Sequence, residues 1–184
     1  MIRVRGIPVS LGFALALSPT VAACGSDLEH LPIDWDQPIT SGRTGTESEA
    51  AAAMPFEVIV PRIDGGPQRI VFTPPESAPL GSRHVEFLFT DRKFGRFHLI
   101  EEVSQTNQRE LEGLARCSWL DGCEGSWKVV DLPRGIRGVL IDGPTANSMI
   151  WLEGTTRFDL LGPSETFDPL AAILVASVTI RTQP

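Results

Sequence analysis

The residues with the clearest potential for acid–base or metal chemistry are the three histidines, His30, His84 and His98. His84 and His98 fall on two predicted strands joined by the polar turn at residues 91–93, so the two rings can meet across a hairpin. Together with Glu86 they supply the side-chain types of a metal site or of an acid–base pair. The alternative, which we favour, places both rings on the solvent-facing side of the hairpin, opposite its apolar side chains.

Other signatures of catalysis are missing from the sequence. Glu101 and Glu102 are adjacent, so on a strand their carboxylates point to opposite faces and do not act as a pair. Gly65-Gly66 precedes neither a helix start nor a Lys-Ser/Thr pair, which favours a hairpin turn over a phosphate-binding loop. The sequence contains no G-x-S-x-G and no H-E-x-x-H. It therefore predicts a protein without enzymatic activity, cofactor or metal.

Two of the three cysteines, Cys117 and Cys123, bracket the short loop Ser-Trp-Leu-Asp-Gly. In an oxidising compartment such a pair persists as a disulfide, and closing so small a loop stabilises a fold by roughly 2–2.5 kcal/mol in the chain-entropy model. A metal site needs further Cys or His ligands near by, and a redox site is typically Cys-x-x-Cys. We therefore predict a structural disulfide between Cys117 and Cys123.

The third cysteine, Cys24, follows a segment with the composition of a secretion signal. Arg3 and Arg5 are the only charges in this segment, residues 7–17 are mostly apolar, and Val21-Ala22-Ala23 supplies small residues before the cysteine. These are the three regions of a secretory signal peptide. The apolar run is shorter than the roughly 20 residues that a membrane-spanning helix needs.

Val21-Ala22-Ala23-Cys24 resembles the bacterial lipobox. The resemblance implies diacylglycerol transfer to the sulfur of Cys24 and cleavage after Ala23, so that fatty acyl chains such as palmitate anchor the protein in a membrane. Two or more buried chains hold a protein stably where one does not. We therefore expect residues 1–23 to be a lipoprotein signal peptide and the protein to lie outside the cytoplasmic membrane, or at the outer membrane of a Gram-negative envelope. The alternative is an ordinary signal peptide with a chance cysteine.

The chain is acidic, with a formal charge of −7, and loss of the leader with its two arginines makes it more negative. This charge argues against nucleic acid as a partner. Residues 24–54 are polar and small, which predicts a lipid anchor followed by a flexible acidic tether. Within them Leu31, Ile33 and Trp35 alternate with Pro32 and acidic residues. This run either docks on the domain or a partner, or is a chance pattern in a disordered linker, and we favour the linker.

Residues 55–184 are long enough for one domain with its own core. Alternating apolar residues and turn residues predict strands at 56–60, 70–72, 85–89, 96–99, 127–132, 138–141, 149–152 and 157–161. Polar turns at 91–93 and at Glu153-Gly154 join strands into hairpins, whereas residues 105–115 form either a short helix or an excursion.

The end of the chain has the pattern of a buried helix. Asp168-Pro169 is an N-cap residue followed by proline at the first helical position, and residues 170–178 contain almost no polar side chain. A helix that is apolar all round is buried, so we expect it in the concave face of the sheet. The predicted fold is therefore α+β: a curved, mainly antiparallel sheet packed against a C-terminal helix.

The segment Pro55-Phe56-Glu57-Val58-Ile59-Val60-Pro61 resembles the opening strand of small bacterial domains known as DUF4367. Residues 138–178 are similar to the end of these domains, with Ile150-Trp151-Leu152-Glu153-Gly154, Phe158-Asp159-Leu160-Leu161-Gly162 and a final apolar helix. The resemblance implies an extracytoplasmic lipoprotein with a curved sheet of the LolA/RseB class, some members of which carry or sense lipidated molecules. It supplies no catalytic residues, and the loop at 117–123 departs from it.

Three tryptophans, Trp119, Trp127 and Trp151, are candidates for the lining of a ligand groove, although sheet tryptophans more often serve as core or edge cover. Together with the resemblance they predict a non-enzymatic envelope lipoprotein. Its partners are the membrane, through lipid on Cys24, and either an apolar ligand or an envelope protein bound in the groove between sheet and helix. The alternative is a purely structural or regulatory protein-interaction module.

Overall fold

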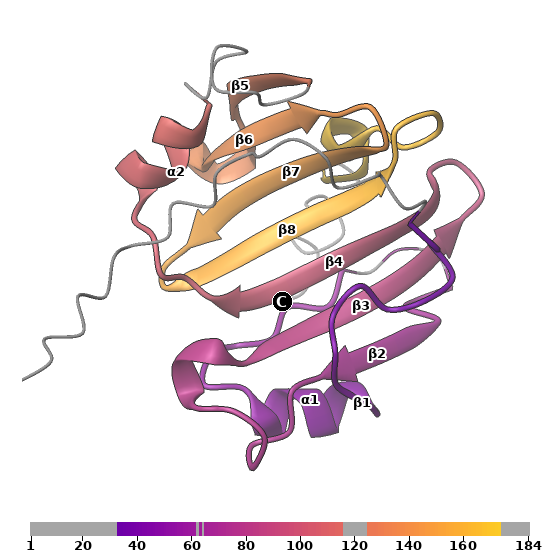
Figure 1. The fold of residues 1–184 in the computed structure, drawn as a ribbon, viewed down its shortest axis with the longest axis vertical. Coiled ribbons are helices and arrows are strands. Elements are labelled where there is room, and N and C mark those ends of the chain that lie inside the picture. Colours follow the sequence, from indigo (N-terminus) through magenta and orange to yellow (C-terminus); the bar gives the residue numbers. More distant parts are fainter. Residues whose placement is uncertain (1–32, 62, 64, 116–124, 174–184) are drawn as a thin grey trace, which may run out of the picture.

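One open sheet of eight strands forms the frame of the molecule (Figure 1). It is seen in a computed structural model, which describes residues 33–61, 63, 65–115 and 125–173. The strands are β1 (Arg43–Thr44), β2 (Arg69–Phe72), β3 (His84–Asp91), β4 (Gly95–Val103), β5 (Ser126–Asp131), β6 (Arg137–Asp142), β7 (Ala146–Glu153) and β8 (Thr156–Pro163). The helices are α1 (Glu47–Ala53) and α2 (Gln108–Leu114), with 3-10 turns at Leu80–Ser82 and Pro133–Gly135. The predicted α+β class with a mainly antiparallel sheet is confirmed.

The strands pair in the order β1-β2-β3-β4-β8-β7-β6-β5, and every neighbouring pair is antiparallel. Two consecutive groups, β1 to β4 and β5 to β8, meet where the last strand of each pairs with the other (Figure 1). In this central pairing Leu99 lies opposite Leu160 and Glu101 lies opposite Phe158. The two halves of the sheet are therefore joined by pairing between residues that are far apart in the chain.

The predicted hairpins form at their polar turns. Between β3 and β4, Asp91 Oδ1 accepts hydrogen bonds from the backbone amides of Lys93 (2.7 Å) and Phe94 (3.0 Å). Between β7 and β8, Gly154 has a φ of +61°, a conformation that glycine adopts without steric cost. The strands predicted from residue 70 onward are confirmed.

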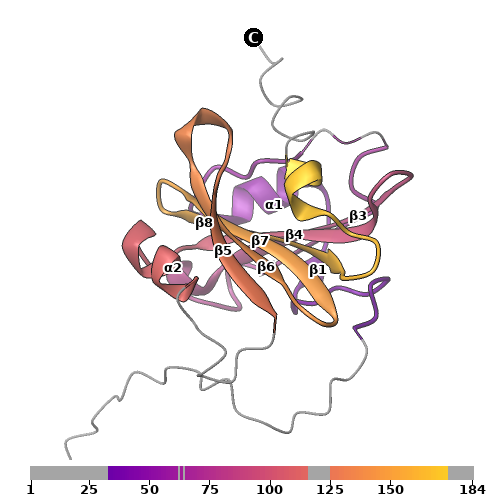
Figure 2. The ribbon, with the colours of Figure 1, turned by 90° about the horizontal axis from the view of Figure 1, so that it is seen from above.

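One face of the sheet, here called the core face, carries the main hydrophobic cluster. Its central members are Phe87, Phe97, Leu99, Met149, Trp151, Phe158 and Leu160. The Phe97 ring stacks on Phe89 and Phe167, with centroids 4.9 and 5.2 Å away. Each such ring contributes roughly 1.5–3 kcal/mol by burial. Helix α1 and a helical turn at residues 169–173 cover this face on the same side of the sheet (Figure 2).

The opposite face, here called the back face, carries a smaller cluster beneath α2. Leu111 of this helix packs against Val139 and Ile150. The helix, one of the two alternatives for residues 105–115, begins at a capping box in which Asn107 and Glu110 each accept a hydrogen bond from the other's backbone amide.

The predicted strand at 56–60 is wrong, and with it the opening strand that the DUF4367 resemblance implied. Residues 55–61 form neither strand nor helix. Instead Phe56, Val58 and Ile59 pack on the core-face cluster while Glu57 is exposed. The segment covers the core face, and its apolar side chains pack on the cluster there. Its backbone does not pair with a strand of the sheet.

The prediction of a flexible tether over residues 24–54 needs correction for residues 33–54. Here the chain forms β1 and α1, and α1 begins at a second capping box, Thr46 with Glu49. The Thr-x-x-Glu spacing signalled this helix in the sequence. Ala50 and Ala53 are buried on the core face, so small residues that suggested a linker serve close packing instead. Residues 24–32 lie outside the described part of the chain.

Asp168 caps the last helical turn, as predicted. Its Oδ1 accepts a hydrogen bond from the backbone amide of Ala171 at 3.0 Å. Ala172 and Ile173, in the same turn, are buried in the core-face cluster.

Candidate functional site

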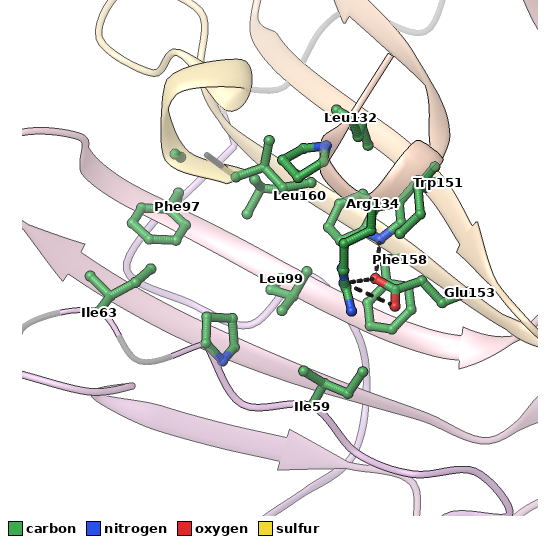
Figure 3. Close-up of a pocket in the computed structure, with 15 residues that line it drawn as sticks. Ile59, Ile63, Phe97, Leu99, Leu132, Arg134, Trp151, Glu153, Phe158 and Leu160 are labelled. Carbon is green, nitrogen blue, oxygen red and sulfur yellow. Dashed lines mark hydrogen bonds and ion pairs between the residues drawn. The ribbon is translucent and has the colours of Figure 1, made fainter. Parts of the chain in front are cut away.

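The core face contains an apolar groove between the sheet and the segments that cover it (Figure 3). Its lining comprises Ile59, Pro61, Ile63, Phe97, Leu99, Leu132, Pro133, Arg134, Ile136, Trp151, Glu153, Phe158, Leu160, Ala172 and Ile173. Its free volume is about 40 Å³. Since one water needs at least 10–15 Å³ of such space, the groove has room for only a few atoms in this conformation.

Three parts of the chain form the groove. Strands β4, β8 and β7 make its floor with Leu99, Leu160 and Trp151, and the Trp151 ring stacks on Phe158 at 4.9 Å. Ile59, Pro61 and Ile63 form one wall. Residues 132–136, which include a 3-10 turn, form another wall (Figure 3).

A polar pair lies at one side of this apolar lining. Arg134 Nη2 donates to both carboxylate oxygens of Glu153 at 3.1 Å, and Trp151 Nε1 donates to Glu153 Oε1 at 3.1 Å (Figure 3). Arg134 has a φ of +67°, the only positive value for a non-glycine residue among those described. Left-handed backbone costs an ordinary residue roughly 1–2 kcal/mol. The wall is thus held in a strained turn that brings the guanidinium to Glu153.

Glu101 is the most unusual polar residue of the core face. Its side chain is fully buried, and Oε2 accepts a hydrogen bond from the backbone amide of Ile59, in the groove wall, at 3.0 Å. Oε1 has no hydrogen-bond partner among the described residues. Burial raises the pKa of Glu101 to about 8, partly opposed by the Ile59 amide and assisted by the negative charge of Glu153. Glu101 is not predictable as a site residue from the sequence, because no local pattern marks a carboxyl group as buried.

Of the three side chains that could form a metal site or an acid–base pair, Glu86 and His98 meet and His84 lies apart from them. His98 Nδ1 lies 2.6 Å from Glu86 Oε1, and both side chains are fully buried. His84 instead contacts the Thr73 hydroxyl at 3.0 Å and the Ser41 carbonyl at 3.1 Å. The expectation that both histidines face solvent is therefore wrong for His98. His98 does lie on the side of the β3–β4 hairpin opposite the apolar side chains, as predicted, but another part of the chain covers that side.

That cover is residues 33–42, here called the N-terminal strap. The backbone amides of Ile39 and Thr40 each donate to the Glu86 carboxylate at 2.8 Å, and the Thr40 hydroxyl donates at 2.6 Å. His98 Nε2 lies 3.1 Å from the carbonyl oxygen of Trp35, whose ring meets the imidazole edge-on. The described part of the run that includes Ile33 and Trp35 therefore docks on the domain, contrary to the alternative that we favoured.

The strap contributes to the lowered pKa of Glu86, the carboxyl group that it covers. Burial alone raises the pKa of Glu86, but hydrogen bonds from His98, Thr40 and Ile39 outweigh it, and the net pKa is lowered. Both ring nitrogens of His98 lie within hydrogen-bond distance of oxygen atoms, Glu86 Oε1 at 2.6 Å and the Trp35 carbonyl at 3.1 Å. The geometry is that of a buried ion pair holding a strap rather than of a ligand site.

The three candidate tryptophans do not gather at one site. Trp151 lines the groove on the core face. Trp127 packs on the opposite, back-face cluster with Val139. Trp119 lies outside the described residues, as do Cys24, Cys117 and Cys123, so the predicted lipid attachment and disulfide remain predictions.

Within the described ranges, no group of three or more His, Cys, Asp or Glu side chains is arranged to hold a metal ion. In those ranges, too, no helix combines the length and apolar character needed to cross a bilayer.

Comparisons with known proteins add no relative. No family model matches the chain, no curated protein matches it, and no solved structure resembles it. The resemblance to DUF4367 domains therefore remains an expectation from the sequence.

Proposed function

We propose that this protein is a non-enzymatic lipoprotein of the bacterial cell envelope, anchored through lipid on Cys24, whose domain binds an apolar ligand in the groove of its core face. The observation that carries the proposal is the groove itself, which has thirteen apolar residues among the fifteen of its lining, with Arg134 and Glu153 as the exceptions. Ligand sites are typically concave and apolar, with a small number of polar groups that fix orientation.

The size of the groove sets a condition on this function. About 40 Å³ is far below the roughly 300–1,000 Å³ of established ligand pockets, so a ligand has to displace one wall. The wall that contains Ile59 is suited to this because the segment leading into it, residues 55–61, belongs to no strand or helix. Its only side-chain hydrogen bond among the described residues is the bond from Ile59 to Glu101. Opening it breaks few hydrogen bonds.

We further propose that the helix starting at Pro169 continues through the apolar run to residue 178 and borders the groove, in the concave face of a curved sheet. Ala172 and Ile173 support this, because both are buried and line the groove. An apolar helix at a groove border offers a second surface that an inserted ligand can share.

The proposed location follows from the leader and from Cys24. Acylation of this cysteine leaves the domain outside the cytoplasmic membrane, where a disulfide between Cys117 and Cys123 persists. Ligand and anchor are then separate, since Cys24 precedes the domain and the groove lies within it.

Native mass spectrometry of protein purified from bacterial membranes tests this function. We expect an acylated Cys24 and an additional apolar molecule that dissociates on denaturation. Ile136→Trp should fill the groove and remove the bound molecule, whereas Ile141→Trp, a half-buried isoleucine of the back face, should leave it bound. Wild-type protein with a lipidated Cys24 and no ligand, which instead crosslinks through Ile136 to an envelope protein, would favour the protein-interaction alternative.

A further inference from the structure

The chemistry of the ligand can be narrowed through Glu101, which belongs to the same face as the groove. Its neighbours across the strands are Val85 on β3 and Phe158 on β8, and Phe158 lines the groove. The amide bonded to Oε2 belongs to Ile59, whose side chain forms part of the wall. Displacing this wall therefore uncovers the carboxyl group at the edge of the apolar lining.

Oε1 of Glu101, which has no partner among the described residues, is costly to the protein by itself. A buried polar atom without a partner loses its hydration and gains nothing in return, a penalty of the order of 1–3 kcal/mol. Most buried polar atoms in native proteins are paired, so an exception asks for an explanation. A leucine at this position would match its surroundings without the penalty. A hydrogen bond that forms only with a bound ligand accounts for a carboxyl group here.

The surroundings of Glu101 set its protonation state, and this state determines which kind of ligand atom can form a hydrogen bond with it. Burial raises the pKa of Glu101 to about 8, so the group is neutral at pH 7. Because Oε2 accepts from the Ile59 amide, the proton belongs on Oε1, which then donates and requires an acceptor.

Charged groups near Glu101 further limit which ligand groups can bind beside it. Val85 and Phe158 flank it on the neighbouring strands, and Ile59 covers it, so these elements present apolar side chains. The charge that acts on it is Glu153 of β7, which is itself paired with Arg134. Glu153 disfavours an anionic head group, and an ammonium would require Glu101 to ionise in an apolar site.

We propose that Glu101 donates a hydrogen bond from Oε1 to the carbonyl oxygen of an uncharged, largely aliphatic ligand whose hydrocarbon part lies in the groove. This assignment rests on the proposed function. It makes Glu101 a specificity residue: the apolar lining supplies affinity and the neutral carboxyl selects the carbonyl.

The test compares two probes of similar length, 2-nonanone and 1-chlorononane, as competitors of Nile red bound to the full-length acylated protein. We expect 2-nonanone to bind roughly fivefold to tenfold more tightly, the value of one hydrogen bond of ordinary strength. The Glu101→Leu variant should bind both equally. Glu101→Gln, whose amide still donates, should keep the preference, as should Glu102→Gln, a matched change on the opposite face of the same strand.

Raising the pH supplies a second readout. The preference of the wild type should disappear as the pH passes about 8, because an ionised Glu101 has no proton to donate. The preference of Glu101→Gln should be independent of pH. Equal binding of both probes by the wild type, or an unchanged preference in Glu101→Leu, overturns the assignment to Glu101 and leaves the groove as a ligand site. If neither the probes nor Nile red bind, the proposed function fails and this inference with it.

Discussion

Two buried glutamates on neighbouring strands show how surroundings set the behaviour of one side-chain type. Glu86 on β3 receives hydrogen bonds from His98 and from the strap, and its pKa is lowered. Glu101 on β4 receives a hydrogen bond from Ile59, and its pKa is raised to about 8. Both side chains are fully buried, so the difference lies in the number of donors that replace lost water.

Glu101 should make the protein lose stability as the pH rises from about 4.5 to 8. Its pKa is about 8 in the folded state and near 4.5 in the unfolded state, so the folded protein binds more protons between these values. The free energy of unfolding then falls as the pH rises from 4.5 to 8 and levels off above it. Thermal melts from pH 5 to 9 should show this decline.

Replacing Glu101 with Gln should flatten the decline and raise the melting temperature at pH 8, because no charge is then forced into the apolar face. Glu102→Gln is the matched control, since Glu102 is partly exposed and forms an ion pair with Arg157 at 3.5 Å. A Glu101→Gln protein with the same pH profile as the wild type would contradict the raised pKa.

At the scale of elements, the N-terminal strap depends on one ion pair. Its buried anchor points are the bonds to Glu86 and His98. Its exposed ones are the Asp36–Arg96 ion pair at 2.7 Å, the hydrogen bond from Arg69 to Gln37 at 3.4 Å and the contact of the Ser41 carbonyl with His84 at 3.1 Å. Asp36 and Arg96 are about half exposed, and exposed pairs contribute less than about 1 kcal/mol. The buried pair is therefore what holds the strap.

Glu86→Gln should release the strap while the sheet remains folded. Removing one partner of a buried ion pair costs about 3–5 kcal/mol, because the other charge is left without compensation. Hydrogen exchange should become faster at the amides of Ile39 and Thr40, and Trp35 fluorescence should shift towards that of an exposed ring. Acid should have the same effect in the wild type, because the lowered pKa of Glu86 makes its contribution present above pH 4.5 and lost as the pH falls below it.

Asp36→Asn is the control for the strap, because it removes the exposed ion pair and leaves the buried one. Its exchange rates at Ile39 and Thr40 should stay close to those of the wild type. If Glu86→Gln and Asp36→Asn behave alike, the buried pair has no special role in holding the strap.

At the scale of the whole molecule, the strap limits how far the domain can lie from its proposed anchor. Ile33 is nine residues after Cys24, and a fully extended chain covers at most about 3.3–3.6 Å for each residue. With the strap docked, the domain thus lies within roughly 30 Å of the lipidated residue. Under the proposed anchor on Cys24, the domain would be held near the membrane rather than on a long tether.

Cys24→Ser should abolish acylation and shift the protein from the membrane to the soluble fraction, with its melting temperature unchanged. The reason is that Cys24 precedes the first described core residue, Ala50, by a long stretch of chain. Membrane fractionation and thermal melts measure the two effects. Quantitative membrane retention of the variant would exclude lipid on Cys24 as the anchor.

Cys117→Ser should have the reverse effect, with membrane attachment kept and stability lowered by roughly 2 kcal/mol through the loss of loop closure. The wild type should lose the same amount in the presence of reductant, and the variant should not respond to it. A wild-type melt that is indifferent to reductant would exclude the disulfide.

The sequence by itself determined the local part of this structure. The alternation at 85–89, the turn at 91–93 and the Glu153-Gly154 hairpin were predictable because each depends on neighbours in the chain. The cap at Asp168 was predictable for the same reason. The capping boxes of α1 and α2 were equally readable, and the helix at 47–53 was missed only because alanine and polar residues also compose linkers.

The tertiary structure alone decided which surfaces are buried. The pairing of β4 with β8, the cover at 55–61 and the strap all bring together residues far apart in the chain. Alternation identifies the two faces of a strand but not what lies against each of them. His98 therefore looked solvent-facing and Glu101 unremarkable, although both are fully buried. The groove follows from the same packing, since its walls come from segments that share no local pattern.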